Sequence, residues 1–357
     1  MSEASEKVDI FCLAGNKNGS STPSNVSIHD FYFDETTGNY LRKAVLFSNK
    51  IFQCMDAVPQ EGMAQFRDIW SGLGMINRPG IKTIFEVNAL TSIELPEKYP
   101  LLTSKLIEEI RNIEKKCLES CDYIVTPSQI TKKYLQEEFK INENKITVIP
   151  NGGDIILTKE SKNLVLPDQY IIYFGALQPW QGIDVLIKSL QYLKDYTDLK
   201  LIICSSVKEK FSKNLKKLAK IVGVDEKIMF YNELDKTELL YILSRAKASI
   251  APLKFGKRNI TQGCCPIKVL ETMAAKTPLI AAEIPVIKEL AQENAYYFWP
   301  EDELDLSRCI RYVLDNEKSA KEKAYNAHQL FLENYTWNHH KDKLNQVYYN
   351  LIETKND

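Results

Sequence analysis

The sequence predicts an α/β fold with two domains, each built on a parallel sheet. Short runs of β-branched and aromatic residues alternate with longer segments of helical periodicity, which is the pattern of βαβ units. The chain has 357 residues, and at about 150 residues per domain this length indicates two hydrophobic cores. A cluster of turn residues at 150–154 separates an expected first domain, 1–155, from a second, 165–336.

The strands and helices are expected in alternation along the chain. Several of the strand candidates are almost continuously apolar, which predicts burial on both faces of a sheet. The strands are expected at 8–13, 81–87, 123–126, 146–149, 170–174, 200–204, 228–230, 248–251, 279–282 and 295–298. The helices are expected at 102–121, 129–139, 183–193, 209–222, 235–244, 267–275, 286–291 and 304–316, with a terminal amphipathic helix over 336–353.

Composition narrows the class of protein. Lys and Arg total 46 against 47 Asp and Glu, so the basic surplus of a nucleic-acid-binding protein is absent. The 8 cysteines form no CxxC pair, and the 4 histidines do not cluster with carboxylates, so we expect reduced thiols and no metal site. Because no signal peptide and no run of about 18 apolar residues occurs, a cytoplasmic protein is expected.

Two stretches depart from a plain scaffold. In the first, a strand ends at Gly175 and a helix follows Gly182, so backbone N–H groups of this loop could face an anion. Such a turn can equally serve backbone geometry alone. In the second, a long polar loop after 248–251 carries Lys254, Lys257 and Arg258 before a helix that begins near Pro266.

Lys268 and Glu271 share a face of that helix. They form either a surface ion pair or a site in which Glu271 accepts from a vicinal diol while the basic groups bind phosphate. Both stretches follow strands of one parallel sheet, and ligands of open α/β folds bind at the carboxyl ends of the strands.

In order and spacing, four segments resemble the retaining glycosyltransferases of family four, the glycosyl transferases group 1 type. They are Val125-Thr-Pro-Ser128 with 145–152, Phe174-Gly-Ala with Gln181-Gly182, Val269-Leu-Glu271 with Thr272-Met-Ala-Ala-Lys-Thr-Pro278, and Tyr335-Thr-Trp337. The Pro-Trp-x-Gly loop and the Cys-Pro-x-Lys helix start resemble one subset of that family.

The resemblance implies a GT-B fold: two Rossmann-like domains facing across a cleft, with the terminal helix, 337–357, crossing back to the first. It implies transfer of a sugar, of hexosyltransferase type, from a nucleoside-diphosphate sugar to a glycan, lipid or small-molecule acceptor. The anomeric configuration would be retained, with no metal and no cofactor, as in surface-polysaccharide assembly.

Site residues are carried over by position. Glu271 would hold the ribose, and Leu234 ends the segment expected at the base. Gly175, Gln181 and Gly182 match the phosphate loop, Gly263 falls at the first glutamate of the Glu-x7-Glu motif, and Asn88 stands where the family places a histidine near the transferred sugar. Lys254, Arg258 and Lys268 would then hold the diphosphate, because the family's Arg and Lys fall at Ala176 and Gln181.

Other polar residues have two interpretations each. Glu86 points to the same side as Asn88, and Arg67 and Asp68 follow a strand, so all could contact the acceptor or sugar, or could cap loops. Glu289 either caps a helix or touches the donor. The helix over 208–222 is either a solvated outer helix or a contact with the inner membrane face.

The N-terminus is shorter than the resemblance implies, since 8–13 looks like the family's second strand. We expect that a first βα unit is missing, unless 15–20 forms a shorter loop. A missing unit would leave a sheet edge for a protein partner to cover. The departures favour, as an alternative, a non-catalytic glycosyltransferase-like subunit or a truncated enzyme that binds a partner or nucleotide sugar without turnover. An epimerase of the same fold is a third reading.

Overall fold

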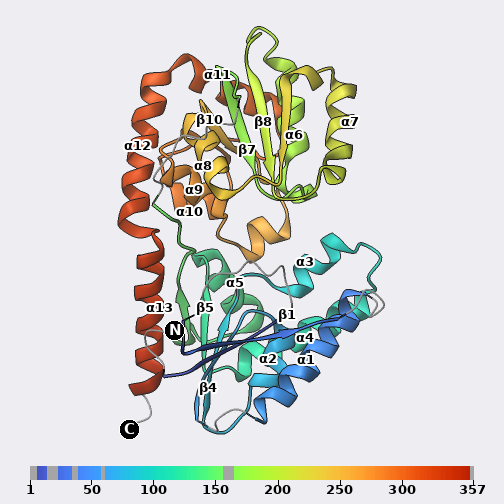
Figure 1. Ribbon diagram of the computed structural model, residues 1–357, viewed down its shortest axis with the longest axis vertical. Coiled ribbons are helices and arrows are strands. Elements are labelled where there is room, and N and C mark those ends of the chain that lie inside the picture. The colour runs from blue at the N-terminus through green and yellow to red at the C-terminus, as the bar shows by residue number, and fades with distance from the viewer. Residues whose placement is uncertain (1–5, 14–22, 34–38, 58–60, 156–164, 354–357) are drawn as a thin grey trace. The chain divides into compact units, whose positions relative to one another are not determined.

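The computed structural model describes residues 6–13, 23–33, 39–57, 61–155 and 165–353. These fall into two compact units (Figure 1). The first unit comprises 1–127, 132–149 and 341–357, and the second comprises 128–131 and 150–340.

The first unit contains a small and a larger parallel sheet. Within the described residues, the larger sheet has four strands in the order β3-β4-β5-β6. Its strands are β3 (Gly62–Phe66), β4 (Ile81–Glu86), β5 (Tyr123–Thr126) and β6 (Ile146–Val148). Its helices are α1 (Tyr40–Met55), α2 (Ile69–Met75), α3 (Thr91–Lys98), α4 (Ser104–Ser120) and α5 (Gln129–Phe139), with a 3-10 turn at Glu143–Lys145.

β1 (Val8–Leu13) lies apart from the larger sheet. Within the described residues it pairs in parallel only with β2 (Val26–Phe31). Phe11 and Phe31 turn toward the core of the first unit, while Ile10 and Ile28 lie opposite one another and are exposed. The predicted segment 15–20 lies outside the described residues.

The terminal helix α13 (Trp337–Glu353) returns to the first unit. Val347, Tyr348 and Leu351 are buried in one cluster with Ile84 and Val125, which lie on β4 and β5. The amphipathic pattern of the terminal segment is therefore satisfied by the face of the larger sheet.

A fully buried carboxylate holds the start of α3. Glu114 of α4 has no exposed surface, and its two oxygens accept from the backbone N–H of Ser92 at 2.8 Å and from the hydroxyl of Ser92 at 2.5 Å. Burial raises the pKa of Glu114, and its hydrogen bonds with Ser92 oppose the shift. This contact fixes α3 directly after the loop that carries Asn88.

Glu114→Gln is expected to change how stability depends on pH. Because the pKa of Glu114 is higher in the folded than in the unfolded chain, its contribution is fully present below the unfolded pKa and is lost as the pH rises through the folded pKa. Urea unfolding of both proteins between about pH 4 and 8 should show the stability of the wild type, relative to E114Q, falling with pH. A constant difference would contradict this account.

The second unit is a doubly wound α/β unit. Within the described residues its sheet has six parallel strands in the order β12-β11-β10-β7-β8-β9. The strands are β7 (Tyr170–Phe174), β8 (Lys200–Ser205), β9 (Ile228–Asn232), β10 (Ala248–Ala251), β11 (Leu279–Ala282) and β12 (Tyr296–Phe298). The α-helices are α6 (Ile183–Ser189), α7 (Lys213–Val222), α8 (Lys236–Arg245), α9 (Ile267–Ala274), α10 (Pro285–Ala291), α11 (Glu303–Asp315) and α12 (Glu317–Asn334). Short 3-10 turns occupy Pro179–Gln181, Leu190–Tyr192, Glu209–Ser212 and Asp225–Lys227.

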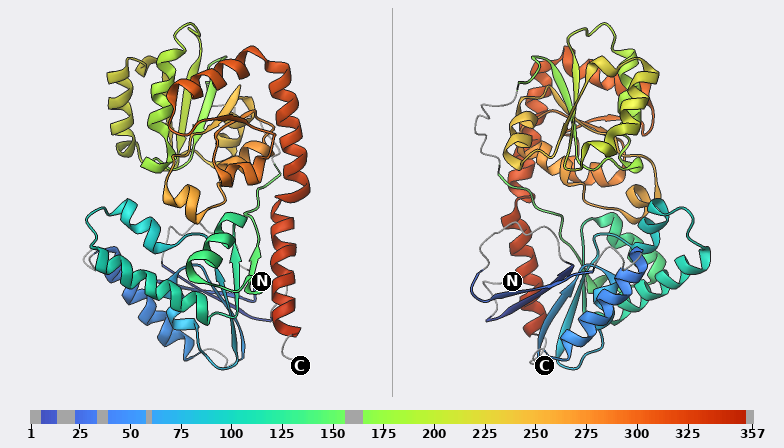
Figure 2. Two further views of the ribbon diagram at one scale, coloured as in Figure 1. Left: turned by 180° about the vertical axis from the view of Figure 1, so that it is seen from behind. Right: turned by 45° about the vertical axis from the view of Figure 1, so that its right-hand side comes forward.

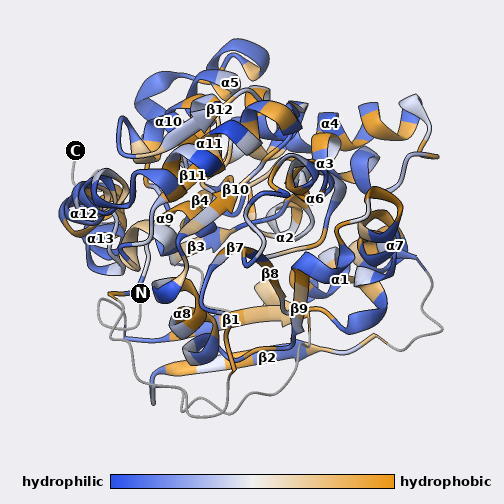
Figure 3. Ribbon diagram, turned by 90° about the horizontal axis from the view of Figure 1, so that it is seen from above, coloured by the Kyte–Doolittle hydropathy of each residue, from blue (hydrophilic) through white to orange (hydrophobic). Residues whose placement is uncertain are grey.

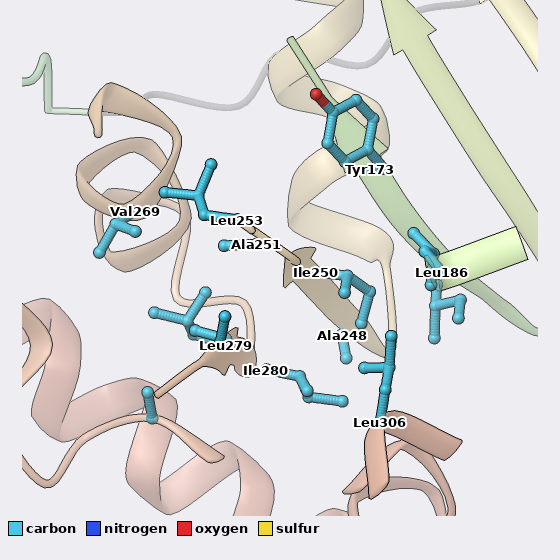
Figure 4. Close-up of a cluster of buried hydrophobic side chains, with 14 of the residues drawn as sticks. Tyr173, Leu186, Ala248, Ile250, Ala251, Leu253, Val269, Leu279, Ile280 and Leu306 are labelled. Atoms are coloured by element: carbon cyan, nitrogen blue, oxygen red, sulfur yellow. The ribbon is translucent and has the colours of Figure 1, made fainter. Parts of the chain in front are cut away.

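Helices cover both faces of this sheet (Figure 2). Alternate residues of β7 enter two different cores: Ile171 and Tyr173 lie in one, and Tyr170, Ile172 and Phe174 in the other. Figure 4 shows the first of these, where Tyr173, Ile250 and Leu279 come from three neighbouring strands. The expectation of strands buried on both faces is confirmed.

Two further sequence expectations can be compared with the structure. All 8 cysteines are free; Cys12, Cys54 and Cys309 are half-buried and the others are buried. Among the described residues, no helix combines the length and the apolar character that crossing a bilayer requires. Figure 3 shows hydrophilic and hydrophobic residues side by side along α7, which carries four lysines of the 208–222 segment: Lys213, Lys216, Lys217 and Lys220.

Candidate functional site

The two stretches that depart from plain scaffold come together in the second unit. β7 and β10 are hydrogen-bonded neighbours, so the loops that follow them leave the same edge of the sheet. The backbone N–H of Lys254 donates to the carbonyl of Trp180 at 3.0 Å, which joins the two loops directly.

Gly182 makes the close approach of these loops feasible. Its φ is +71°, and a Cβ built on it would lie 1.7 Å from the carbonyl oxygen of Pro252. Only glycine satisfies both the left-handed backbone and the absence of space. These contacts support the interpretation that Gly182 serves backbone geometry. Gly182 thereby shapes the loop that was expected to bind phosphate.

The loop after β10 is not irregular, as the sequence suggested, but contains a π-helix at Lys257–Gln262. π-helical turns are rare in proteins, and those that occur are often found at functional sites. Asn259 within it is fully buried, and its amide donates to the carbonyl of Lys254 at 2.8 Å and that of Trp180 at 3.4 Å. These tertiary hydrogen bonds explain why local sequence patterns do not reveal the turn.

Lys268 is the best-placed cation of the site. Its ammonium donates to Oε1 of Gln181 at 2.5 Å and lies 4.1 Å from the ring centre of Tyr173. Burial lowers the pKa of Lys268 to about 7, and Glu271 opposes the shift. An ammonium whose pKa lies near neutrality, at the carboxyl edge of a parallel sheet, is suited to an anionic ligand.

Glu271 lies one turn further along α9 and is half-buried. Burial raises the pKa of its carboxyl group, while Lys236 and Lys268 lower it. Within the described residues no hydrogen bond or ion pair engages this carboxylate. The interpretation of Lys268 and Glu271 as a surface ion pair is therefore wrong. The carboxylate of Glu271 retains its capacity to accept hydrogen bonds.

The other two predicted cations lie on the same loop. Lys254 forms an ion pair with Asp184 at 2.8 Å, and Arg258 lies over the ring of Trp180 at 6.0 Å. Both partners, Asp184 and Trp180, lie in or next to the 175–182 loop, which was expected to bind phosphate. Lys254, Arg258 and Lys268 are thus each in contact with residues in or next to the 175–182 loop of the second unit.

Gly263 cannot hold the glutamate that the resemblance places there. Its φ is +82°, and a Cβ would lie 2.8 Å from Oγ of Ser128 and 2.9 Å from the backbone nitrogen of Thr131, residues grouped with the second unit. Any side chain at this position would require the backbone to move. The departure from Glu-x7-Glu is therefore built into the packing.

The segment expected to hold the nucleotide base, 231–234, begins with the last two residues of β9 and continues beyond the strand. Leu234 is half-buried and, like Tyr231, packs against the core that contains Ile202; between them Glu233 has a left-handed φ of +56°. The N–H of Glu233 donates to the carbonyl of Ser205 at 2.8 Å. Non-glycine residues with such a φ are uncommon and indicate a locally constrained turn.

The predicted residues of the first unit gather at the carboxyl ends of β3 and β4. Glu86 accepts from the amide of Asn88 at 2.8 Å and from Gln65 at 2.7 Å, and Arg67 approaches it at 3.2 Å. On its other side, Gln65 accepts from the hydroxyl of Tyr348 in α13 at 2.5 Å. Asn88, Glu86 and Arg67 thus form one hydrogen-bonded cluster.

Asp68 and Glu289 hold helix ends. The Asp68 carboxylate accepts from the N–H groups of Trp70 and Ser71, both at 3.0 Å, and caps α2. This supports the capping alternative for Asp68, and its contact with an acceptor stays a prediction. Glu289 accepts from the N–H of Gln129 at 2.8 Å, which supports the capping alternative.

Sequence reasoning missed the residues that connect the site. Asn259, Tyr173 and Asp184 position the cations, and no periodicity or motif marked them. Lys268 and Gln181, which share a hydrogen bond, lie 87 positions apart. Among the described residues, no group of three or more His, Cys, Asp or Glu side chains is arranged to hold a metal ion.

Comparison with protein families matches two successive parts of the chain. Residues 64–155 match the family described as Glycosyltransferase Family 4, and residues 154–330 match Glycosyl transferases group 1. The O-antigen chain mannosyltransferase RfbU of Salmonella typhimurium is 27% identical over 206 residues, which are 57% of this chain and 54% of that protein. An uncharacterized glycosyltransferase of Haemophilus influenzae is 32% identical over 181 residues, or 50% and 47% of the two chains. The chain thus spans about half the length of these curated relatives.

Solved structures show the same fold at low sequence identity. Sucrose-phosphate synthase from Thermosynechococcus elongatus superposes with a TM-score of 0.80 at 16% identity, covering 97% of this chain and 89% of that one. Anabaena HepE in complex with UDP and glucose gives 0.71 at 14% identity, covering 97% and 100%. These neighbours confirm the GT-B fold. With two family models matching in succession over residues 64–330, the chain has a GT-B fold and is similar to glycosyltransferases of the group 1/family 4 type.

Proposed function

We propose that this protein is a retaining glycosyltransferase whose second unit binds a nucleoside-diphosphate sugar. The observation that carries the proposal is the half-buried Lys268, whose ammonium donates to Gln181 of the expected phosphate loop. It lies one turn before Glu271, whose carboxylate makes no hydrogen bond or ion pair within the described residues. A cation and a hydrogen-bond acceptor at this spacing suit a diphosphate and a ribose diol on one ligand. The UDP and glucose held by Anabaena HepE support a ligand of this class.

Each residue has a proposed role. Glu271 accepts hydrogen bonds from the ribose hydroxyls, and the 231–234 segment offers backbone groups to the base. Lys268, with Lys254 and Arg258 on the neighbouring loop, neutralises the charge that develops on the leaving diphosphate. With these cations in place, the proposed reaction requires no metal.

In the proposed reaction, the bond between the anomeric carbon and the diphosphate oxygen breaks. A bond from the acceptor hydroxyl oxygen forms on the same face of the sugar, and the hydroxyl proton passes to the leaving phosphate oxygen. Asn88, held by Glu86, is proposed to contact the transferred sugar, and Arg67 the acceptor. The acceptor is a glycan, a lipid or a small molecule.

The test is nucleotide binding with and without Glu271. Thermal unfolding of the full chain is followed with UDP, GDP, ADP, CMP and dTDP, using E271A and, as a matched control, E322A on the exposed face of α12. A ligand at 100 times its Kd stabilises by about 2.7 kcal/mol. We expect one diphosphate to stabilise the wild type and E322A, and E271A to lose this effect. Equal stabilisation of all three proteins would refute the assignment.

One observation favours a second candidate, a non-catalytic subunit that binds the nucleotide sugar without turnover. Gly263 leaves no space for the family's first glutamate, so the sugar contact that it supplies is absent. Release of nucleoside diphosphate from any donor, above the level of E271A, would exclude this candidate. Binding without release would support it.

A further inference from the structure

Two exposed aromatic side chains stand at the ligand-binding edge of the second unit. Phe255 follows β10 in the loop that also carries Lys254, and Trp299 follows β12. Their side chains are 61% and 67% exposed. Since β10 and β12 run parallel in one sheet, both residues leave it at the same edge as the phosphate loop. We call Phe255 and Trp299 the aromatic rim.

The backbone of the aromatic rim is anchored, although its rings are not. The N–H of Phe255 donates to the carboxylate of Glu301 at 3.3 Å, and the N–H of Trp299 donates to that of Asp305 at 2.7 Å. Within the described residues neither ring stacks on another ring or on a cation. Both rings are thus exposed to solvent on a backbone that these hydrogen bonds anchor.

The turn that links the rim is constrained. Glu301 has a left-handed φ of +66°, which is costly for a residue with a side chain. Its carboxylate reaches across to Phe255, and the next residue, Asp302, caps α11. The loop after β12 therefore keeps Trp299 exposed at a conformational cost and is tied to the loop that exposes Phe255. Exposed apolar side chains that gather in one place are typical of a binding surface.

The charge around the rim selects among partners. Residues 301–305 carry four carboxylates, those of Glu301, Asp302, Glu303 and Asp305. The cations next to Phe255, which are Lys254, Lys257 and Arg258, do not outnumber these four carboxylates. The rim therefore lacks the basic surplus that accompanies aromatic residues anchored in an anionic membrane. A neutral saccharide fits instead, because the negative face of an aromatic ring attracts the polarised C–H groups of a sugar ring, and carboxylates accept from its hydroxyls.

We infer that the aromatic rim binds a sugar ring of the acceptor, so that the acceptor is a saccharide. This inference rests on the proposed function, because it takes Lys254 and Arg258, which flank Phe255 in the loop after β10, to hold the donor diphosphate. The rim is a second subsite on the same edge of the sheet, and its residues play no part in holding the nucleotide.

The test measures saccharide binding by saturation-transfer NMR on the full chain. The probes are linear hexasaccharides of mannose, glucose and N-acetylglucosamine. We expect the wild type to bind at least one probe, and W299A and F255A to bind it at least tenfold more weakly. W299F, which keeps a ring, should remain within about threefold of the wild type. Y325A, which removes an aromatic ring that is 54% exposed from α12, serves as the control and should bind normally.

Three outcomes would overturn the inference: no probe binding by the wild type, unchanged affinity in both W299A and F255A, or loss of binding in Y325A as well. Retention on phosphatidylglycerol vesicles that W299A abolishes would assign the rim to a membrane instead. The thermal shift with nucleotides separates this failure from that of the proposed function. If W299A keeps the nucleotide shift but saccharide binding fails, only the saccharide inference falls; if no nucleotide shift depends on Glu271, the donor assignment falls.

Discussion

Lys268→Met is expected to weaken nucleotide binding severely and, at the same time, to stabilise the empty protein. A charge-assisted hydrogen bond to phosphate contributes about 1.5–3 kcal/mol, so the affinity should fall roughly 10- to 100-fold. Without ligand the effect reverses, because burial disfavours the ammonium that the variant removes.

The pH dependence of this stabilisation has a definite sign. The pKa of Lys268 is about 7 in the folded chain, against about 10.4 for a free lysine. Between these values the unfolded chain binds more protons, so the stability of the wild type rises with pH. The advantage of K268M should therefore be largest at and below pH 7 and should shrink toward pH 10. Urea unfolding at pH 6, 8 and 9.5 measures it.

Nucleotide binding should also take up a proton. At pH 8 most of the Lys268 side chains in the empty site are neutral, and a bound diphosphate favours the charged form. Calorimetric titrations in Tris and in HEPES should then differ in apparent enthalpy for the wild type but not for K268M. Equal affinity of K268M and wild type, with equal proton uptake, would remove Lys268 from the site.

Gly182→Ala is expected to have the largest effect on folding. The added Cβ would lie 1.7 Å from the carbonyl oxygen of Pro252, a backbone atom that cannot turn aside. The loops after β7 and β10 must then separate, which should cost more than about 4 kcal/mol, an exceptional value for one substitution. Nucleotide binding should be lost with the loop.

Gly223→Ala provides the matched control. Gly223 has nearly the same φ, +72°, but nothing lies within 4 Å of its Cβ position. Its replacement should cost only the left-handed backbone penalty, about 1–2 kcal/mol. Thermal or urea unfolding of G182A and G223A separates two costs. Both variants have the left-handed backbone penalty, and only G182A has the steric clash with Pro252. If the two lose equal stability, the close approach to Pro252 is not what constrains Gly182.

Much of the fold could be predicted because buried parallel strands are locally recognisable. The runs at 123–126, 170–174, 248–251 and 279–282 are confirmed with the same bounds, since each is apolar and bounded by turn or helix signals. α12 (Glu317–Asn334) was missed. Three of its buried residues are alanines, Ala320, Ala324 and Ala327, which give a weak apolar pattern among charged neighbours.

The site was predictable where one segment carries it. Lys268 and Glu271 share a helix face, and the structure places both at the carboxyl edge of the sheet. Gln181 itself was expected in the site, but its hydrogen bond with Lys268 was not predictable. The contacts of Asp184 and Trp180 with the loop after β10 were not predictable either, because all of these contacts are tertiary. Asp68 shows why a carboxylate at a strand end is an ambiguous signal: here it caps the helix that follows, α2.

The route of the chain also has a consequence for biosynthesis. The first unit takes its last packed segment from 341–357, so Val347 and Leu351 reach Ile84 and Val125 after the whole second unit has been translated. The second unit has no such dependence, since 150–340 are contiguous apart from Ser128–Thr131. During synthesis the domain made first is therefore completed last, and until then the face of its sheet that α13 covers is open to chaperones.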